Sequence, residues 1–115
     1  MELVDLVNDV KALRTHSRTY HVDDLGEYGE LVFFSEDLPE WEASLQRHLG
    51  PPVKAKLQPV TPELKAVTEP FGELFDHQTL YLKETSGTRM IAMLWPWRDN
   101  IHTTLKLIFQ KSFEA

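Results

Sequence analysis

The sequence predicts a single α+β domain over residues 1–115, with a mostly antiparallel β-sheet and two or three helices packed on one face of it. Apolar residues recur at helical spacing in the first half of the chain, and they alternate with polar residues in the last third. Turn residues, and no linker, separate these segments. The predicted order of elements is α-β-β-α-β-α-β-β-β, and 115 residues suffice for one hydrophobic core.

The first elements are a helix and two strands. Residues 2–15 place apolar side chains every three or four positions and polar side chains between them, which predicts an amphipathic helix. Residues 18–22 and 31–34 are rich in β-branched and aromatic residues, and we expect a strand at each. Two glycines within residues 23–29 predict a loop between these strands.

The second helix has a start signal, an apolar stripe and a stop signal. Asp37 and Glu40 have the spacing of a capping box, in which each side chain accepts a hydrogen bond from a backbone amide of the first turn. Gly50 follows the last apolar residue and is suited to end the helix. The residues that share one face of this helix are Leu38, Trp41, Leu45 and Leu49.

The middle of the chain predicts one more strand and a short helix. Residues 53–58 alternate between apolar and polar, which is typical of a half-buried strand. Thr61 and Pro62 suit the cap and the first position of a helix, and Pro70 with Gly72 ends it soon afterwards.

The last third predicts three antiparallel strands. Residues 78–85 and 88–95 flank Ser86-Gly87, which is a tight-turn signal. A two-residue loop would place the oppositely charged Glu84 and Arg89 across from each other and would stack apolar pairs. These apolar pairs are Leu82 with Ile91 and Leu80 with Met93.

Residues 90–95 are apolar on both faces of their predicted strand. We therefore expect a central strand, covered on both sides by this chain or on one side by a partner. Residues 96–100 form the next connection, and residues 101–110 alternate in a long final strand. The doubly apolar strand also leads us to expect a homodimer, formed through the sheet or an edge strand.

Composition and charge limit the classes of function. Twelve basic residues against 18 acidic ones give a net charge of −6, which argues against nucleic-acid binding. The absence of cysteine excludes disulfides, thiolate metal sites and cysteine nucleophiles. The N-terminus lacks the basic segment of a signal peptide, and no apolar run is long enough to cross a bilayer. We expect a cytoplasmic protein without membrane contact.

The candidate site is the aromatic stretch between the last two strands. Trp95 and Trp97 flank a proline, and Arg98 and Asp99 follow. With His102 at the start of the final strand, these residues predict a ligand-binding patch of indole and guanidinium groups. The competing interpretation is structural: Trp95 packs in the core, Trp97 covers the sheet end, and Arg98 pairs with Asp99. The partner class, protein or small molecule, stays open.

The leading hypothesis is a small, non-enzymatic binding or interaction domain that needs no cofactor. None of the five histidines has the spacing of metal ligands, so no metal site is expected. The alternative is a small enzyme acting on an anionic or carbonyl substrate. His77 or His102 would supply the acid/base group, and Arg98 or Arg89 would anchor the anion. This alternative requires the four side chains to converge.

A nucleic-acid interface is the third hypothesis. Lys54, Lys56, Lys83 and Lys106 occupy polar positions of predicted strands, and Tyr81 shares its phase with Lys83. Such residues form a surface for single-stranded RNA only if they share one sheet face.

Overall fold

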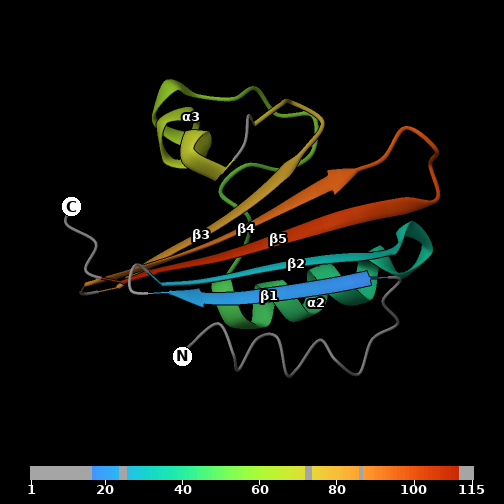
Figure 1. The fold of residues 1–115 in the computed structure, drawn as a ribbon. Helices are drawn as coiled ribbons and strands as arrows, with labels where there is room; N and C mark the ends of the chain where they lie inside the picture. The colour runs from blue at the N-terminus through green and yellow to red at the C-terminus, as the bar shows by residue number, and fades with distance from the viewer. Residues whose placement is uncertain (1–16, 24–25, 72–73, 86, 112–115) are drawn as a thin grey trace.

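The computed structural model describes residues 17–23, 26–71, 74–85 and 87–111. Five strands form one antiparallel sheet in the order β1-β2-β5-β4-β3 (Figure 1). The strands are β1 (Ser17–Asp23), β2 (Gly26–Phe34), β3 (Thr79–Thr85), β4 (Thr88–Pro96) and β5 (His102–Lys111). The helices are α2 (Leu38–Leu49) and α3 (Pro62–Thr68), with 3-10 turns at Ser35–Asp37 and Glu69–Phe71. The α+β class and the antiparallel sheet are confirmed. The helix predicted at residues 2–15 lies outside the described residues.

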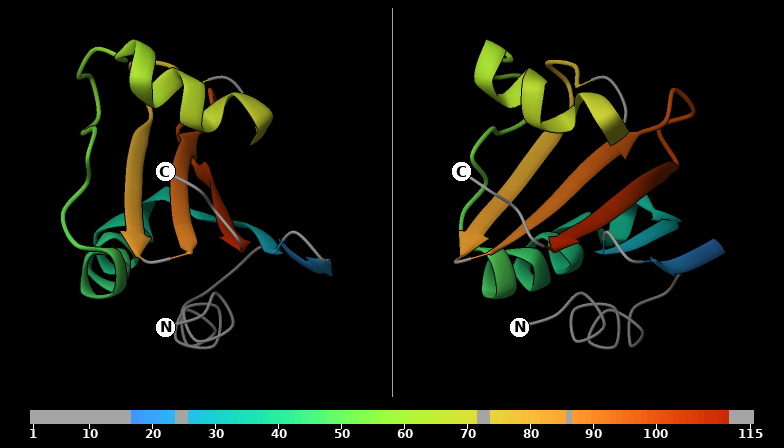
Figure 2. Two further views of the ribbon diagram at one scale, coloured as in Figure 1. Left: turned by 90° about the vertical axis from the view of Figure 1, so that its left-hand side faces the viewer. Right: turned by 60° about the vertical axis from the view of Figure 1, so that its left-hand side comes forward.

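The two described helices cover opposite faces of the sheet, and the prediction of helices on one face is wrong (Figure 2). The cause is β4, whose alternate residues point to opposite faces. Met90, Ala92 and Leu94 belong to the cluster that contains the apolar stripe of α2. Ile91 and Met93 belong to the cluster on which Leu64 and Val67 of α3 pack. A strand that is apolar on both faces needs a cover on each.

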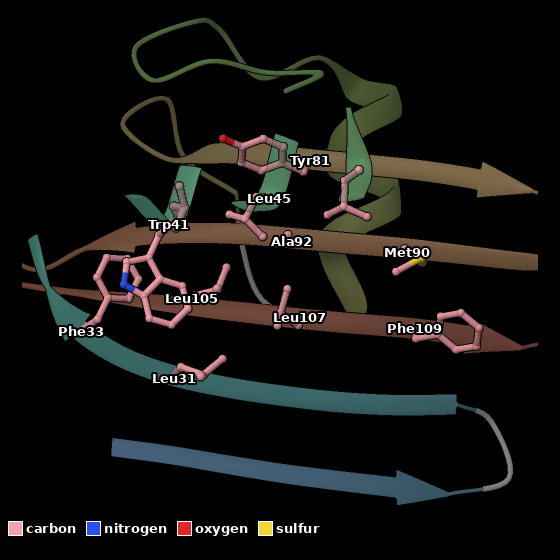
Figure 3. Close-up of a cluster of buried hydrophobic side chains, with 12 residues drawn as sticks. Leu31, Phe33, Trp41, Leu45, Tyr81, Met90, Ala92, Leu105, Leu107 and Phe109 are labelled. Carbon is pink, nitrogen blue, oxygen red and sulfur yellow. The ribbon is translucent and has the colours of Figure 1, made fainter. Parts of the chain in front are cut away.

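The larger cluster lies between α2 and the sheet (Figure 3). Trp41 and Leu45 of α2 are fully buried there, as their spacing predicted. The rings of Trp41 and Phe33 stack with centroids 4.6 Å apart. Burying one such aromatic side chain stabilises the fold by about 2–3 kcal/mol.

The ends of the helices match the sequence signals in part. Gly50 follows α2 with φ 80°, a left-handed conformation that glycine adopts without strain. Thr61 caps α3, because its hydroxyl accepts a hydrogen bond from the Leu64 amide. The prediction of a capping box at the start of α2 is wrong. Asp37 makes no side-chain cap hydrogen bond, and a 3-10 turn leads directly into the helix.

Two predicted segments differ in the structure. Residues 53–58 form no strand and contribute only one bridge, from Lys54 to Leu80 of β3. The predicted loop at residues 23–29 is shorter than expected, because β2 begins at Gly26 and pairs with both β1 and β5. Thus the element order in the described residues is β-β-α-α-β-β-β.

Lys54 is buried, although its place in the alternating pattern predicted a solvated side chain. Its ammonium donates hydrogen bonds to the backbone carbonyls of Ala55, Asp76 and Gln78. Burial lowers the pKa of Lys54, and the nearby Asp76 carboxylate opposes this shift. Lys54 therefore ties the segment before α3 to the turn that enters β3.

The register of the β3–β4 hairpin is confirmed. Leu82 pairs with Ile91, Leu80 with Met93, and Thr85 with Thr88 across the turn. Glu84 lies opposite Arg89, with their charged groups 3.8 Å apart. None of the helices in the described ranges has the length and apolar character needed to cross a membrane.

Lys54→Met should lower the free energy of unfolding by about 3 kcal/mol, because three backbone carbonyls, one of them in a buried hydrogen bond, lose their charged donor. Urea unfolding followed by circular dichroism measures this change. Lys56→Met is the matched control, since Lys56 is exposed in the same segment, and it should stay within about 0.5 kcal/mol of wild type. Equal effects of the two variants would contradict the role given to Lys54.

Candidate functional site

The end of β4, the start of β5 and the tight turn between them, residues 95–102, form what we call the β4–β5 corner. The Trp97 amide donates to the His102 carbonyl at 2.9 Å, and the Asn100 amide donates to the Trp97 carbonyl at 3.3 Å. Asn100 has φ 59°, a left-handed conformation that asparagine tolerates better than most residues. The corner therefore has a defined backbone shape.

Asp99 fixes the second half of the corner. One of its oxygens, Oδ1, accepts hydrogen bonds from the amides of Ile101 and His102, at 2.8 and 3.0 Å. The other, Oδ2, lies 2.7 Å from His102 Nδ1. The hydrogen bond from His102, followed by the two backbone bonds, lowers the pKa of Asp99 to about 2. Asp99 thus pairs with His102, and not with Arg98 as the structural interpretation proposed.

Trp97 is held at one edge and open to solvent elsewhere. Its indole Nε1 donates to the Thr104 hydroxyl at 2.8 Å. Its ring lies 4.9 Å from the His102 ring, at a tilt of 41°. Even so, 43% of the residue is exposed. The Trp97 indole is therefore exposed at the corner, and its orientation is set by Thr104 and His102.

Trp95 belongs to the packing of the sheet more than to the exposed patch. It is partly buried against the cluster that contains Ile91 and Met93. The Lys106 ammonium lies 3.9 Å from its ring centroid, within cation–π range. The exposed Arg98 extends from the turn itself. Of the predicted site residues, His102 contacts both Trp97 and Asp99.

A hollow of about 350 Å³ lies beside the corner and was not foreseen from the sequence. It is lined by Phe34 at the end of β2, by Glu36 of the 3-10 turn that follows, and by Asn100 and Ile101 from the corner. The Phe34 ring lies 5.4 Å from the His102 ring, so Phe34, His102 and Trp97 form a continuous row of rings. This row extends the predicted patch across β5.

Hydrogen bonds hold the two sides of the hollow together. The Ser35 amide donates to the Ile101 carbonyl at 2.7 Å, and the Ser35 and Thr103 hydroxyls lie 2.8 Å apart. No sequence signal points to this contact, because Ser35 and Thr103 are 68 positions apart. The pairing of β2 with β5 alone brings them together.

Of the residues of the enzymatic alternative, Arg98 and His102 lie at the corner, whereas Arg89 and His77 lie away from it. Arg89 pairs with Gln110 in register, at the end of β4 away from Trp95; six residues of strand separate them by roughly 20 Å. His77 precedes β3, which β4 separates from β5, and its ring stacks on Phe75. Within the described ranges no three metal-ligating side chains gather.

The lysines of the nucleic-acid hypothesis do not share a sheet face. Lys54 is buried. Lys83 reaches the His48 carbonyl at the end of α2, whereas Lys106 lies over Trp95 on the opposite face. Tyr81 is buried in the cluster beneath α2. The surface that this hypothesis requires is therefore not formed.

Comparisons of the chain with protein-family models, with curated proteins and with solved structures gave no match. What the corner can do follows from its own groups. It presents an indole, an aliphatic side chain, an amide and a carboxylate around a backbone turn held by hydrogen bonds. Groups of these kinds can form apolar contacts and hydrogen bonds with another molecule.

The Asp99 carboxyl should titrate with a pKa of about 2, measured by carboxyl ¹³C NMR. In His102→Ala the largest cause of the shift is removed, and the pKa should rise toward 3.8. A carboxyl with a lowered pKa stabilises the fold fully above its unfolded value. The contribution of Asp99 should therefore disappear as the pH falls through about 2. A pKa near 3.8 in the wild-type protein would show that the turn is not held in this way.

Proposed function

We propose that this protein is a small, non-enzymatic binding module that recognises a protein partner through the β4–β5 corner. One observation carries the proposal: Trp97 is anchored at its indole nitrogen, yet 43% of it is exposed. Tryptophan and arginine dominate the energy of protein interfaces, and Arg98 follows Trp97 directly. An indole already held in position loses little conformational entropy on binding.

The surroundings of Trp97 favour a protein partner over a small molecule. Ile101, at the other side of the turn, is 55% exposed and adds apolar surface. Among the described residues that line the hollow, Glu36, Asn100 and Ile101 are exposed, so the hollow is open to solvent. Sites for small molecules usually enclose most of the ligand. A raised turn beside an open hollow fits the surface of another protein better.

Trp97→Ala should weaken partner binding by about thirty-fold or more, as expected for an interface hot spot worth about 2 kcal/mol. Proteins from the source organism that bind immobilised wild-type chain are quantified by mass spectrometry, and the affinity of the main binder is then measured. Circular dichroism confirms that the variant is folded, and Trp97→Phe, which keeps an aromatic ring, should retain part of the affinity.

Phe75→Ala is the matched control for Trp97→Ala. Phe75 is 45% exposed, almost the same fraction as Trp97, but it lies in the turn before β3. This variant should bind like wild type. If both variants, or neither, lose the partner, the corner is not the recognition surface.

The doubly apolar strand led us to expect a second copy of this chain as a partner. The outer edge of β1 favours this expectation, because a second copy can pair with it. β1 is an outer strand of the sheet, and no described strand pairs with its outer side. The edge of β3, in contrast, is partly covered by the bridge to Lys54. An open strand edge can pair with an identical edge around a twofold axis.

Sedimentation equilibrium at micromolar concentration should therefore find a species of twice 13.4 kDa. Trp97→Ala should leave this dimer intact, because the corner is not part of β1. A single species of 13.4 kDa would remove the dimer while leaving the binding role of the corner open to its own test.

A further inference from the structure

We infer that the turn at residues 55–58 is a second protein-docking site, at which Leu57 enters an apolar pocket of a partner and Lys56 pairs with a carboxylate beside that pocket. The inference does not depend on the corner, because a different set of observations carries it. These observations are the backbone conformation of Leu57, its exposure, the hydrogen bonds that hold the turn and the charge of Lys56.

Leu57 has a backbone conformation that leucine rarely adopts. The Gln58 amide donates to the Ala55 carbonyl at 3.1 Å, which closes a four-residue turn. Leu57, the third residue of this turn, has φ 71°, whereas Lys56, the second residue, does not have a positive φ. This combination defines a type II turn, whose third position favours glycine or asparagine. A left-handed leucine is strained, because its Cβ approaches the following carbonyl oxygen.

The fold gains little from a leucine at this position. Leu57 is 74% exposed, more than any other large apolar residue that the structure describes. It belongs to neither apolar cluster of the sheet. A single exposed leucine is common on protein surfaces, but this one is also strained, so neither packing nor backbone preference accounts for it. Strained residues that persist in folded proteins gather at functional sites.

The surrounding structure holds the turn in this conformation. The Leu57 amide donates to the Asp76 carbonyl at 2.7 Å. The Ala55 amide donates to Gln58 Oε1, also at 2.7 Å. The buried Lys54 ammonium donates to the carbonyls of both Ala55 and Asp76. These bonds join the turn to the segment that enters β3, so a fixed backbone presents the exposed leucine, and a partner need not order it on binding.

The charges at the turn favour an acidic partner surface. Lys56 is exposed and makes no ion pair with any residue that the structure describes. The Asp76 carboxylate of the neighbouring segment accepts a hydrogen bond from the Val60 amide and interacts with the charge of the buried Lys54. Two lysines and one aspartate leave a positive charge here, on a chain whose net charge is −6. A carboxylate beside the partner's apolar pocket complements this charge.

The first measurement separates docking from a structural role of the leucine. Leu57→Asn places a residue that this turn position favours and removes the apolar side chain. The variant should unfold at the same urea concentration as wild type or at a higher one, as measured by circular dichroism. A lower midpoint would show that leucine stabilises the turn, and it would overturn the inference.

The second measurement identifies the partner. The full chain carries a photoreactive diazirine side chain in place of Leu57 and is irradiated in an extract of the source organism. The same side chain in place of the exposed Glu63 of α3 is the reference. The cross-linked peptides are sequenced. The partner residue joined to position 57 should be apolar, with aspartate or glutamate beside it.

The purified partner is then titrated with the wild-type chain and its variants by calorimetry. Leu57→Asn should weaken binding by about tenfold or more, because the burial of a leucine side chain is lost. Lys56→Gln should weaken it by about threefold and reduce its dependence on salt, since an exposed ion pair is removed. Val53→Asn is the matched control: Val53 is 46% exposed in the same segment but outside the turn, and the variant should change the affinity less than about twofold.

Three results would each overturn the inference: no protein cross-linked at position 57 above the level at position 63, full affinity in Leu57→Asn, or equal losses in Leu57→Asn and Val53→Asn. Trp97→Ala distinguishes this site from the proposed function. A partner lost only in Leu57→Asn docks at the turn, and one lost only in Trp97→Ala docks at the corner and refutes the turn. A partner lost in both variants contacts both surfaces and supports both proposals.

Discussion

The pairing of β2 with β5 is the constraint on which the rest of the structure depends. It joins the N-terminal hairpin to the β3-β4-β5 meander, and its register places Phe34 directly opposite His102. The five-stranded sheet is one layer because of this contact. The hollow exists for the same reason, since the end of β2 and the β4–β5 corner form its two sides. Closing a pairing between segments this far apart is entropically costly, and the burial of apolar side chains on both faces of β5 offsets the cost.

The candidate site lies on the sheet face that α3 covers only in part. Leu64 and Val67 of α3 pack on the cluster built from β3, β4 and Ile108. Elsewhere on this face, side chains pair with each other. The Tyr28 hydroxyl donates to Glu30 at 2.7 Å, and Lys106 lies over Trp95. Trp97, which follows Trp95 beyond Pro96, is exposed next to these pairs.

The proposal that the corner recognises a partner is supported by the hydrogen bonds that fix its shape. Asp99 occupies the position from which one carboxylate can accept two backbone amides and contact the His102 ring. The same contacts orient His102, which separates Phe34 from Trp97 in the row of rings. The exposed surface is therefore attached to a turn with few remaining conformations, and a partner need not order it on binding.

The sequence by itself determined the features that depend on neighbouring residues. The turn at Gly87 and the alternation on both sides of it predicted the β3–β4 register, and the stripe on α2 predicted Trp41 and Leu45 in the core. The indoles on either side of Pro96 predicted an aromatic patch after β4, and Trp97 is exposed there. Only the tertiary structure decided the opposite placement of the helices, the burial of Lys54 and the meeting of Phe34 and Glu36 with the corner. Each of these depends on which distant segment reaches a given surface. Periodicity along the chain shows that a surface will be buried or exposed, but it does not say what will lie against it.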